Sequence, residues 1–273
     1  MAETGRTTLY YFTGTGNSLA VARAIAAGLG GATLIPIASL DRTARITVPT
    51  EKVGIVCPVY FYTVPLIVRE VLARLDLSKV RYTFLVLTMG GLPGLAVEHA
   101  EECLAKSGGR LDAAFPIRML GNYIAEYNVR RERAVQAMLL RTKRRVAEVV
   151  EAVGSKRTHV KHGGPVGRAL SRAMFALLGR RFLAACRMLD RRFTVDSTCI
   201  HCGTCARVCP VENVRLVEGR PTWLGHCEQC FACIHFCPVA AIQIRGKNTR
   251  ARGRYHHPDV TAEDVAAQKA KAQ

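Results

Sequence analysis

A cysteine pattern that occurs twice between residues 199 and 238 constrains this chain most strongly. Each copy has the form C-x2-C-x2-C-x3-C-P, first as CIHCGTCARVCP and then as CEQCFACIHFCP. Three thiolates on one tight loop can hold one inorganic group, whereas the fourth cysteine lies too far along the chain to join them. We therefore expect the fourth cysteine of each copy to serve the group held by the other copy.

This spacing resembles the ligand run of bacterial-type ferredoxins, which carry two 4Fe-4S clusters. The repeat has an offset of 28 residues, and each half reads as short strand, cysteine loop, short helix and short strand. The predicted ligands form a first cysteine set and a second cysteine set. The first set is Cys199, Cys202, Cys205 and Cys237, and the second is Cys227, Cys230, Cys233 and Cys209.

Two other uses of the cysteines fit the pattern less well. A zinc site usually takes four ligands from two CxxC pairs, not from runs of this kind. A disulfide framework is disfavoured because the chain lacks a secretory signal. His201, His226 and His235 lie beside the cysteines, and we interpret them as neighbours of the ligands because the cysteine sets are already complete.

The chain has 273 residues, which is long enough for an α/β domain and a small cysteine-rich module. We predict a first domain at 1–153, a basic linker with an amphipathic helix at 154–192, a two-cluster domain at 193–245 and a basic tail at 246–273. No segment approaches the ~20 apolar residues of a membrane span. The beginning of the sequence has no signal-peptide pattern, so the expected location is the cytoplasm.

Basic residues outnumber acidic ones, with 39 Lys and Arg against 21 Asp and Glu, which gives a formal net charge of +18. One interpretation is attraction to an acidic redox partner or to an anionic membrane surface. The other is a solvated, arginine-rich surface without a partner. We expect no nucleic acid partner, and we predict no oligomeric state.

The first predicted strand, residues 7–12, is followed by the sequence TGTGNS at residues 13–18. This segment resembles the flavin mononucleotide (FMN) phosphate site of flavodoxins. Glycines there permit unusual backbone angles, and the amides at the start of the next helix, residues 19–29, can face an anion. The segment matches neither G-x4-G-K-[ST] nor G-x-G-x-x-G, so two better-known phosphate loops are excluded. The predicted phosphate loop consists of Thr13, Gly14, Thr15, Gly16, Asn17 and Ser18.

Strands and helices alternate regularly after this loop. Strands are predicted at 32–37, 52–57, 81–88 and 110–119, and helices at 64–75, 93–107 and 124–153. This alternation is typical of a flavodoxin-like, doubly wound parallel sheet of five strands in the order 2-1-3-4-5. Ligands of such sheets bind outside the carboxyl ends of the strands.

Three more loops leave those carboxyl ends and carry residues suited to a flavin ring. Aromatic rings can stack on the isoalloxazine, and glycine-rich turns let the backbone approach its polar edge. The candidate residues are Pro58, Val59, Tyr60 and Phe61, then Thr88, Met89, Gly90, Gly91 and Gly94, and finally Asn122 and Tyr123.

Together, TGTGNS, the P-x-Y loop, the T-x-G-G-x-x-G turn and the N-Y turn, followed by the paired cysteine runs, resemble the flavodoxin/ferredoxin fusion family of electron carriers. The resemblance implies FMN in the first domain, two 4Fe-4S clusters in the second and electron transfer between them. It also implies a redox partner. An alternative keeps these cofactors but makes the protein an oxidoreductase that reduces a small acceptor, such as a quinone, at the flavin.

The predicted linker helix at 168–192 is amphipathic. Its apolar stripe is Leu170, Met174, Leu177, Leu178, Ala185 and Met188, and arginines surround it. The stripe can pack on the first domain and position the clusters, or it can dock on a membrane surface or a partner. In the tail we predict a short helix at 262–271 and assign it no chemistry.

Overall fold

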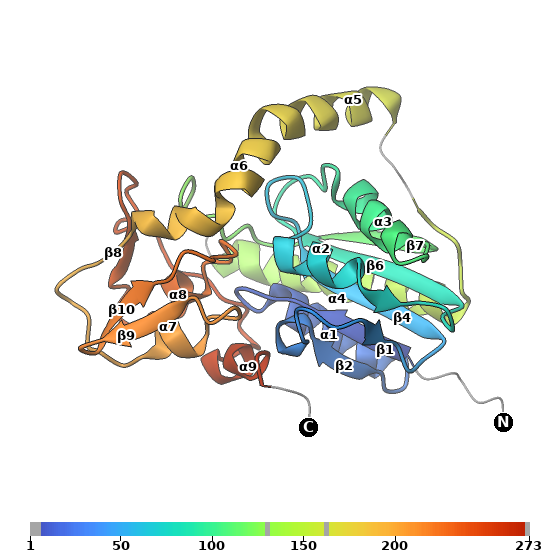
Figure 1. Ribbon diagram of the computed structural model, residues 1–273, viewed down its shortest axis with the longest axis horizontal. Coiled ribbons are helices and arrows are strands. Elements are labelled where there is room, and N and C mark those ends of the chain that lie inside the picture. Colours follow the sequence, from blue (N-terminus) through green and yellow to red (C-terminus); the bar gives the residue numbers. More distant parts are fainter. Residues whose placement is uncertain (1–6, 129–131, 161–163, 271–273) are drawn as a thin grey trace.

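The computed structural model describes residues 7–128, 132–160 and 164–270. An α/β domain lies beside a smaller cysteine-rich domain, and the helices of residues 165–192 arch from one to the other (Figure 1). Parts of the predictions lie outside the described residues: 1–6 of the first domain, 129–131 of the predicted helix 124–153, 161–163 of the linker and 271–273 of the tail.

Five parallel strands form the sheet of the first domain in the order β2-β1-β4-β6-β7. Numbered among themselves, these strands have the order 2-1-3-4-5, which confirms the flavodoxin-like prediction. Their side chains are apolar and mostly buried, as expected for strands covered on both faces. The bounds are β1 Thr7–Tyr11, β2 Thr33–Pro36, β4 Lys52–Pro58, β6 Tyr82–Met89 and β7 Ala113–Arg118.

Four helices cover this sheet in two pairs, because α1 contacts α4 and α2 contacts α3 (Figure 1). Their bounds are α1 Asn17–Gly28, α2 Leu66–Leu72, α3 Ala96–Lys106 and α4 Glu132–Gly154. A 3-10 turn at Ile37–Ser39 and the short parallel pair of β3 (Ile46–Thr47) and β5 (Leu75–Asp76) were not predicted.

The predicted start of the long helix at Ile124 is wrong. Residues 124–128 form turns, and α4 begins at Glu132. The tail binds this segment, since Arg252 donates to the carbonyl oxygen of Ile124 and the amide of Gly253 donates to the side chain of Asn128. These contacts span more than 120 residues of sequence, so a local pattern could not reveal them.

The cysteine-rich domain follows its internal repeat. Strand, cysteine loop, helix and strand occur once as β8 (Phe193–Val195), α7 (Thr204–Arg207) and β9 (Val214–Val217). They occur again as β10 (Arg220–Trp223), α8 (Ala232–His235) and β11 (Ile242–Ile244). Because β8 pairs with β11 and β9 pairs with β10, the two halves are interleaved.

The linker region is a chain of helical segments. They are α5 (Pro165–Met174), a π-helical turn (Phe175–Gly179), α6 (Arg180–Ala185) and a 3-10 segment (Cys186–Arg192). Of the two interpretations of the apolar stripe, inward packing does not hold for its leucines, because Leu170, Leu177 and Leu178 are exposed. The buried apolar side chains are Phe175, Phe182 and Cys186, about half a turn away.

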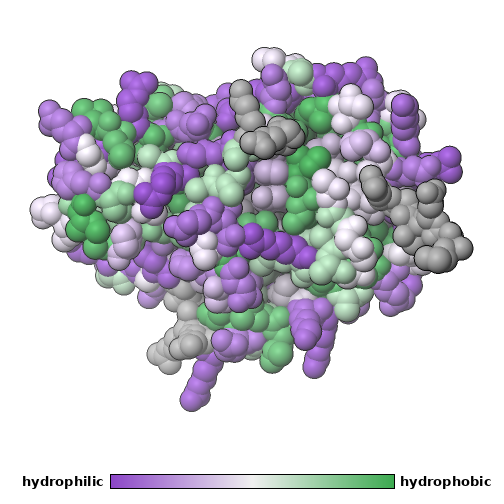
Figure 2. Space-filling view, turned by 90° about the horizontal axis from the view of Figure 1, so that it is seen from below, coloured by the Kyte–Doolittle hydropathy of each residue, from purple (hydrophilic) through white to green (hydrophobic). Residues whose placement is uncertain are grey.

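The C-terminal tail, residues 246–270, returns to the first domain and ends with α9 (Ala262–Ala267). The predicted short helix is present but ends earlier than residue 271, and it begins with a capping box in which Thr261 and Asp264 bond reciprocally. Asp264 also forms an ion pair with Arg23 of α1. Seen from below, the molecular surface mixes hydrophilic and hydrophobic side chains over its whole area (Figure 2). Within the described residues, no helix is long and apolar enough to cross a membrane.

Candidate cofactor site

A pocket of about 500 Å³ opens at the carboxyl ends of the central strands, where ligands of doubly wound sheets bind. Fifteen of the seventeen candidate flavin residues line it, so the structure brings four separate loops to one cavity. The two exceptions are Gly16 and Gly94, which do not line the pocket and instead pack against other residues. Gly94 has φ +61° and packs against Tyr62, and Gly16 has φ +94° and faces His257 and Val260.

The phosphate loop is shaped by its own residues. Gly16 is the N-cap of α1 in a left-handed conformation, and its amide donates to Thr13 Oγ1 at 3.0 Å. The first amides of α1, at Asn17 and Ser18, have no partner within the helix and suit an anion. No lysine or arginine occurs in the loop, so the donors that it offers are neutral.

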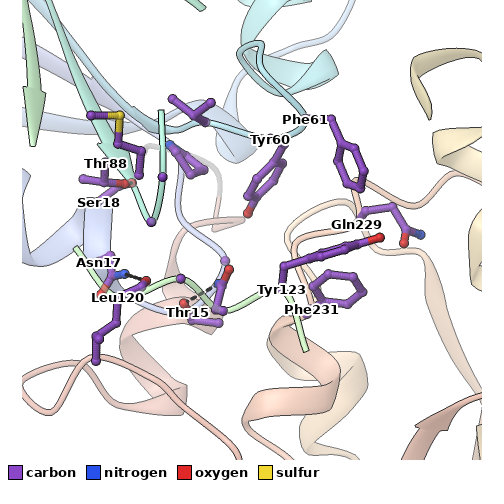
Figure 3. Close-up of a pocket in the computed structure, with 18 of the residues that line it drawn as sticks. Thr15, Asn17, Ser18, Tyr60, Phe61, Thr88, Leu120, Tyr123, Gln229 and Phe231 are labelled. Carbon is purple, nitrogen blue, oxygen red and sulfur yellow. Dashed lines mark hydrogen bonds between the residues drawn. The ribbon is translucent and has the colours of Figure 1, made fainter. Parts of the chain in front are cut away.

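Two side chains of this loop hold neighbouring loops in place (Figure 3). Thr15 Oγ1 accepts a hydrogen bond of 2.8 Å from the amide of Asn122, which follows β7. The hydroxyls of Ser18 and Thr88 are 2.8 Å apart, which joins α1 to the end of β6. These two contacts therefore hold three of the loops that line the pocket together.

Asn17 has a structural role that the sequence did not predict. We expected its amide to bind an anion, but its Nδ2 donates to the carbonyl oxygen of Leu120 at 3.2 Å. Its Oδ1 accepts from the hydroxyl of Tyr255, in the tail, at 2.8 Å. The side chain thus connects the phosphate loop to both the β7 loop and the tail.

The tail also binds the backbone of the phosphate loop. Gln268 is fully buried, and its side-chain amide accepts from the nitrogen and donates to the carbonyl oxygen of Thr13. The amide of His257 donates to the carbonyl oxygen of Thr15 at 2.8 Å. The tail thus forms the outer support of the loop, although its sequence carried no signal of such a role.

Aromatic side chains form the other end of the pocket. The ring of Phe61 meets Tyr123 edge to face at 5.0 Å and stacks on Phe182 of α6 at 3.4 Å between centroids. Phe61 and Tyr62 have positive φ angles of 46° and 66°, so the loop turns sharply there. Phe61 is thereby turned toward the linker and not across the pocket.

The second cysteine loop supplies a wall of this pocket, which the sequence did not predict. Gln229 and Phe231, on either side of Cys230, both line the cavity (Figure 3). Gln229 is 6% exposed, and its Nε2 has no hydrogen-bond partner among the described residues. A buried donor of this kind fits a site whose remaining partner is a bound group.

The first cysteine set also gathers in one place. A small cavity in the cysteine-rich domain is lined by all four of its cysteines, including Cys237 from the other copy. Cys202 is exposed, and the neighbouring Ile200 is 58% exposed. This set therefore lies near the surface.

The second cysteine set is deeper. Burial raises the pKa of Cys230 to about 12 and holds the pKa of Cys227 and of Cys233 well above the usual range. Cys209 interacts electrostatically with all three, although it belongs to the other copy. Thiols in such surroundings bind metal as thiolates only if metal binding releases their protons.

The sulfur atoms do not converge on one point. Among the described residues, no three Cys, His, Asp or Glu side chains are arranged to hold a single metal ion. Zinc would need thiolate sulfurs about 2.3 Å from a common centre. The four cysteines of the first set instead line one small cavity together.

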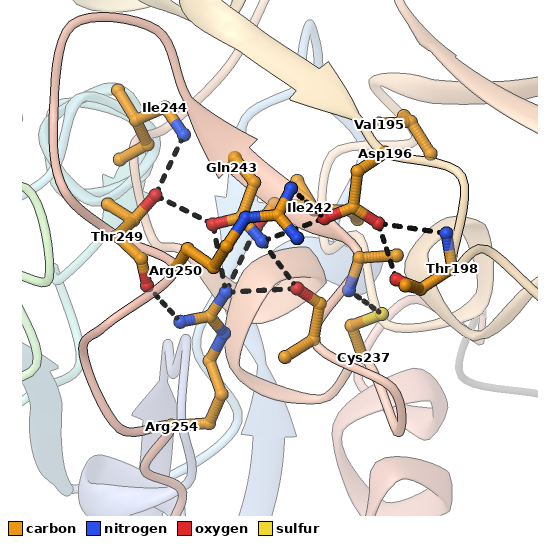
Figure 4. Close-up of polar contacts among 12 residues, drawn as sticks. Val195, Asp196, Thr198, Cys237, Ile242, Gln243, Ile244, Thr249, Arg250 and Arg254 are labelled. Carbon is orange, nitrogen blue, oxygen red and sulfur yellow. Dashed lines mark hydrogen bonds and ion pairs between the residues drawn. The ribbon is translucent and has the colours of Figure 1, made fainter.

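A polar network fixes the strand ends beside Cys237 (Figure 4). Arg254, in the tail, donates to the carbonyl oxygens of Ala240 and Ile242, and burial lowers its pKa. Cys237 Sγ accepts from the amide of Ala241 at 3.2 Å. The tail therefore supports a cysteine loop as well as the phosphate loop.

The fold and the cysteine sites define a flavodoxin-like domain joined to a ferredoxin-type 4Fe-4S domain. Residues 193–238 match the family described as the 4Fe-4S dicluster domain. No curated protein matches the sequence.

Several solved structures are similar to part of this chain. Rubredoxin oxygen:oxidoreductase from Desulfovibrio gigas has 12% identity and a TM-score of 0.32, and the match covers 54% of this chain and 36% of that one. A flavodoxin from the domain Archaea has 16% identity and a TM-score of 0.34, with 54% and 98% covered. Megasphaera elsdenii flavodoxin has 14% identity and a TM-score of 0.34, with 52% and 98% covered.

Proposed function

We propose that this protein transfers electrons between two 4Fe-4S clusters, held by the two cysteine sets, and an FMN in the pocket of the first domain. When bound, a cluster carries one electron at a time and FMN can accept two, so the pair converts between one-electron and two-electron chemistry. The observation that carries the proposal is the shared wall: Gln229 and Phe231 of the second cysteine loop line the pocket.

The residues of this wall place the two sites in direct contact. The carbonyl oxygen of Cys230 packs against Gly14 of the phosphate loop, and the hydroxyl of Tyr60 lies beside the same glycine. Phe231 is 5.5 Å from Tyr123 between ring centroids, which closes the wall on the aromatic side. The second cysteine loop is therefore itself part of the pocket wall.

The two cysteine sets differ in exposure, and this difference supports a path for electrons from the surface to the pocket. The first set lies near the surface, where Ile200 is 58% and Val239 is 38% exposed beside its cavity. The second set is buried against the pocket. A redox partner would meet the first set, and the net charge of +18 favours an acidic partner.

Anaerobic reconstitution followed by iron, sulfide and flavin analysis tests this proposal. We expect about eight irons and one FMN per chain. Bound zinc in place of iron, or failure of FMN to bind the reconstituted protein, would refute it.

One observation favours a second function, the reduction of a small lipophilic acceptor at the flavin. Leu92 and Leu178 both line the pocket and are 68% and 46% exposed, so its rim is open and apolar. Phe61 lines the same pocket and stacks on Phe182 of α6.

Steady-state oxidation of the reduced protein by a soluble quinone separates the two functions, with reduced methyl viologen as the electron donor. An acceptor site predicts a quinone KM that rises in Leu178→Glu while iron and FMN contents stay unchanged. A rate no greater than that of free FMN would leave electron transfer to a protein partner as the only proposed function.

A further inference from the structure

The outward face of the linker helices is apolar and uncovered. Val166 is 82%, Leu170 62% and Leu177 58% exposed, and the spacing of these residues places them on one side of a helix. Phe175 and Phe182 occupy the opposite side, where they pack against His99 and Phe61. In Figure 1, α5 lies above α2 and α3 as the outermost layer of the molecule. The inner contacts therefore fix the helices, while the outer leucines are exposed.

The charge of this segment has one sign. Residues 165–189 contain five arginines and no acidic residue. Two of the arginines fasten the segment to the first domain, since Arg168 pairs with Glu98 and Arg187 pairs with Glu70. The other three are Arg172, Arg180 and Arg181, and no ion pair joins them to an acidic side chain in the part of the chain that the structure describes.

We propose that this face, defined by Val166, Leu170 and Leu177 with their flanking arginines, docks on an anionic lipid surface. An exposed row of aliphatic side chains bordered by arginines suits the boundary between head groups and acyl chains. The leucines can enter the apolar layer while the guanidinium groups bind lipid phosphates.

Docking in this way has a consequence for the pocket. Leu178 belongs to the same helical segment and lines the pocket at its open rim. A protein bound through α5 would hold that rim close to the lipid, where lipophilic molecules dissolve. The docking itself requires no cofactor, so it stands independently of the proposed electron transfer.

Co-sedimentation of the full-length holoprotein with vesicles tests the proposal. One set of vesicles is phosphatidylcholine, and the other is phosphatidylcholine mixed with phosphatidylglycerol. We expect binding to the mixed vesicles that weakens as salt is raised, because exposed charges are screened. We expect much less binding to phosphatidylcholine alone.

Two double variants and a control variant test whether this face is the one that binds the vesicles. Leu170→Glu with Leu177→Glu should weaken binding to mixed vesicles at least about tenfold, since the apolar area that enters the lipid is lost and two negative charges are added. Arg172→Gln with Arg180→Gln should weaken binding and reduce its salt dependence. Leu140→Glu is the matched control, because Leu140 is a leucine of α4 that is 67% exposed, and this variant should bind as the wild type does.

Three results would overturn the proposal. The first is a wild-type protein that fails to bind mixed vesicles at low salt. The second is equal loss of binding in the control and the double leucine variant. The third is binding to an acidic protein that the leucine variants abolish, with no vesicle binding at all.

Discussion

Gly14 of the phosphate loop touches the backbone of Cys230 in the second cysteine loop. A Cβ at position 14 would lie 2.5 Å from the carbonyl oxygen of Cys230 and 2.9 Å from the hydroxyl of Tyr60. No real side chain fits at such distances, so only glycine allows the two loops to meet. The requirement for glycine is therefore set by the other domain as much as by the phosphate that the loop is proposed to bind.

The variant Gly14→Ala should weaken this contact. Its methyl group overlaps backbone, which cannot move as a flexible side chain can, and overpacking typically costs about 1–3 kcal/mol. We expect FMN affinity to fall about tenfold or more while the iron content is unchanged. Flavin fluorescence titration of the cluster-loaded protein measures this.

Gly154→Ala is the control for that variant, because a Cβ at position 154 meets no atom within 4 Å. Unchanged FMN affinity in Gly14→Ala would show that the two loops separate in solution.

The cysteine assignment predicts which single substitutions act alike. Cys209→Ser and Cys230→Ser should each lose the cluster beside the pocket and keep the other cluster. Cys237→Ser and Cys202→Ser should each lose the cluster near the surface and keep the cluster beside the pocket. Iron analysis and EPR of the reduced proteins distinguish the two patterns, and Cys209→Ser behaving like Cys202→Ser would contradict ligation across the two copies.

The hydrogen bonds of Gln268 predict that the tail stabilises the phosphate loop. Gln268→Ala leaves the nitrogen and carbonyl oxygen of Thr13 buried without their partner, at a cost of about 1–3 kcal/mol. We expect a lower urea midpoint and weaker FMN binding. Gln136→Ala changes an exposed glutamine of α4 and should leave both unaltered; equal effects in the two variants would argue against a supporting role for the tail.

We predict that the stability of the protein depends on the protonation of His99, on which the linker packs. Burial lowers its pKa, and it lies 2.7 Å from the hydroxyl of Thr63 and 4.5 Å from the ring of Phe175. A histidine whose pKa is lowered by folding contributes stability above its unfolded pKa of about 6.5, and this contribution is lost as the pH falls through the lowered pKa.

The measurement is the change in urea midpoint between about pH 7.5 and pH 5.5, compared for the wild type and His99→Gln. The wild type should lose more stability on acidification, because glutamine does not titrate. Equal losses in the two proteins would show that His99 contributes nothing to the pH dependence.

The sequence predicted those features that depend on local pattern. The strand order followed from β-α alternation, and fifteen of the flavin candidates line the pocket because loops at the ends of parallel strands meet at one edge. The interleaved halves of the cysteine-rich domain followed from its repeat.

The features that were missed depend on contacts between distant segments. Gln229 and Phe231 lie between predicted cysteine ligands, and the cysteine pattern assigns them no role. In the structure they form a wall of the pocket. Gln268 reaches Thr13 across 255 positions. The linker helix had two apolar sides, and periodicity could not show that Phe182 faces inward while Leu177 faces outward.

The most direct test of the central claim is the rate at which FMN is reduced when electrons enter through the clusters. In rapid mixing of the reconstituted protein with a one-electron donor, we expect cluster bleaching followed by flavin bleaching at a rate independent of protein concentration. Cys202→Ser should slow both steps, because it removes the surface cluster. Clusters that become reduced while a bound FMN stays oxidised would contradict the account.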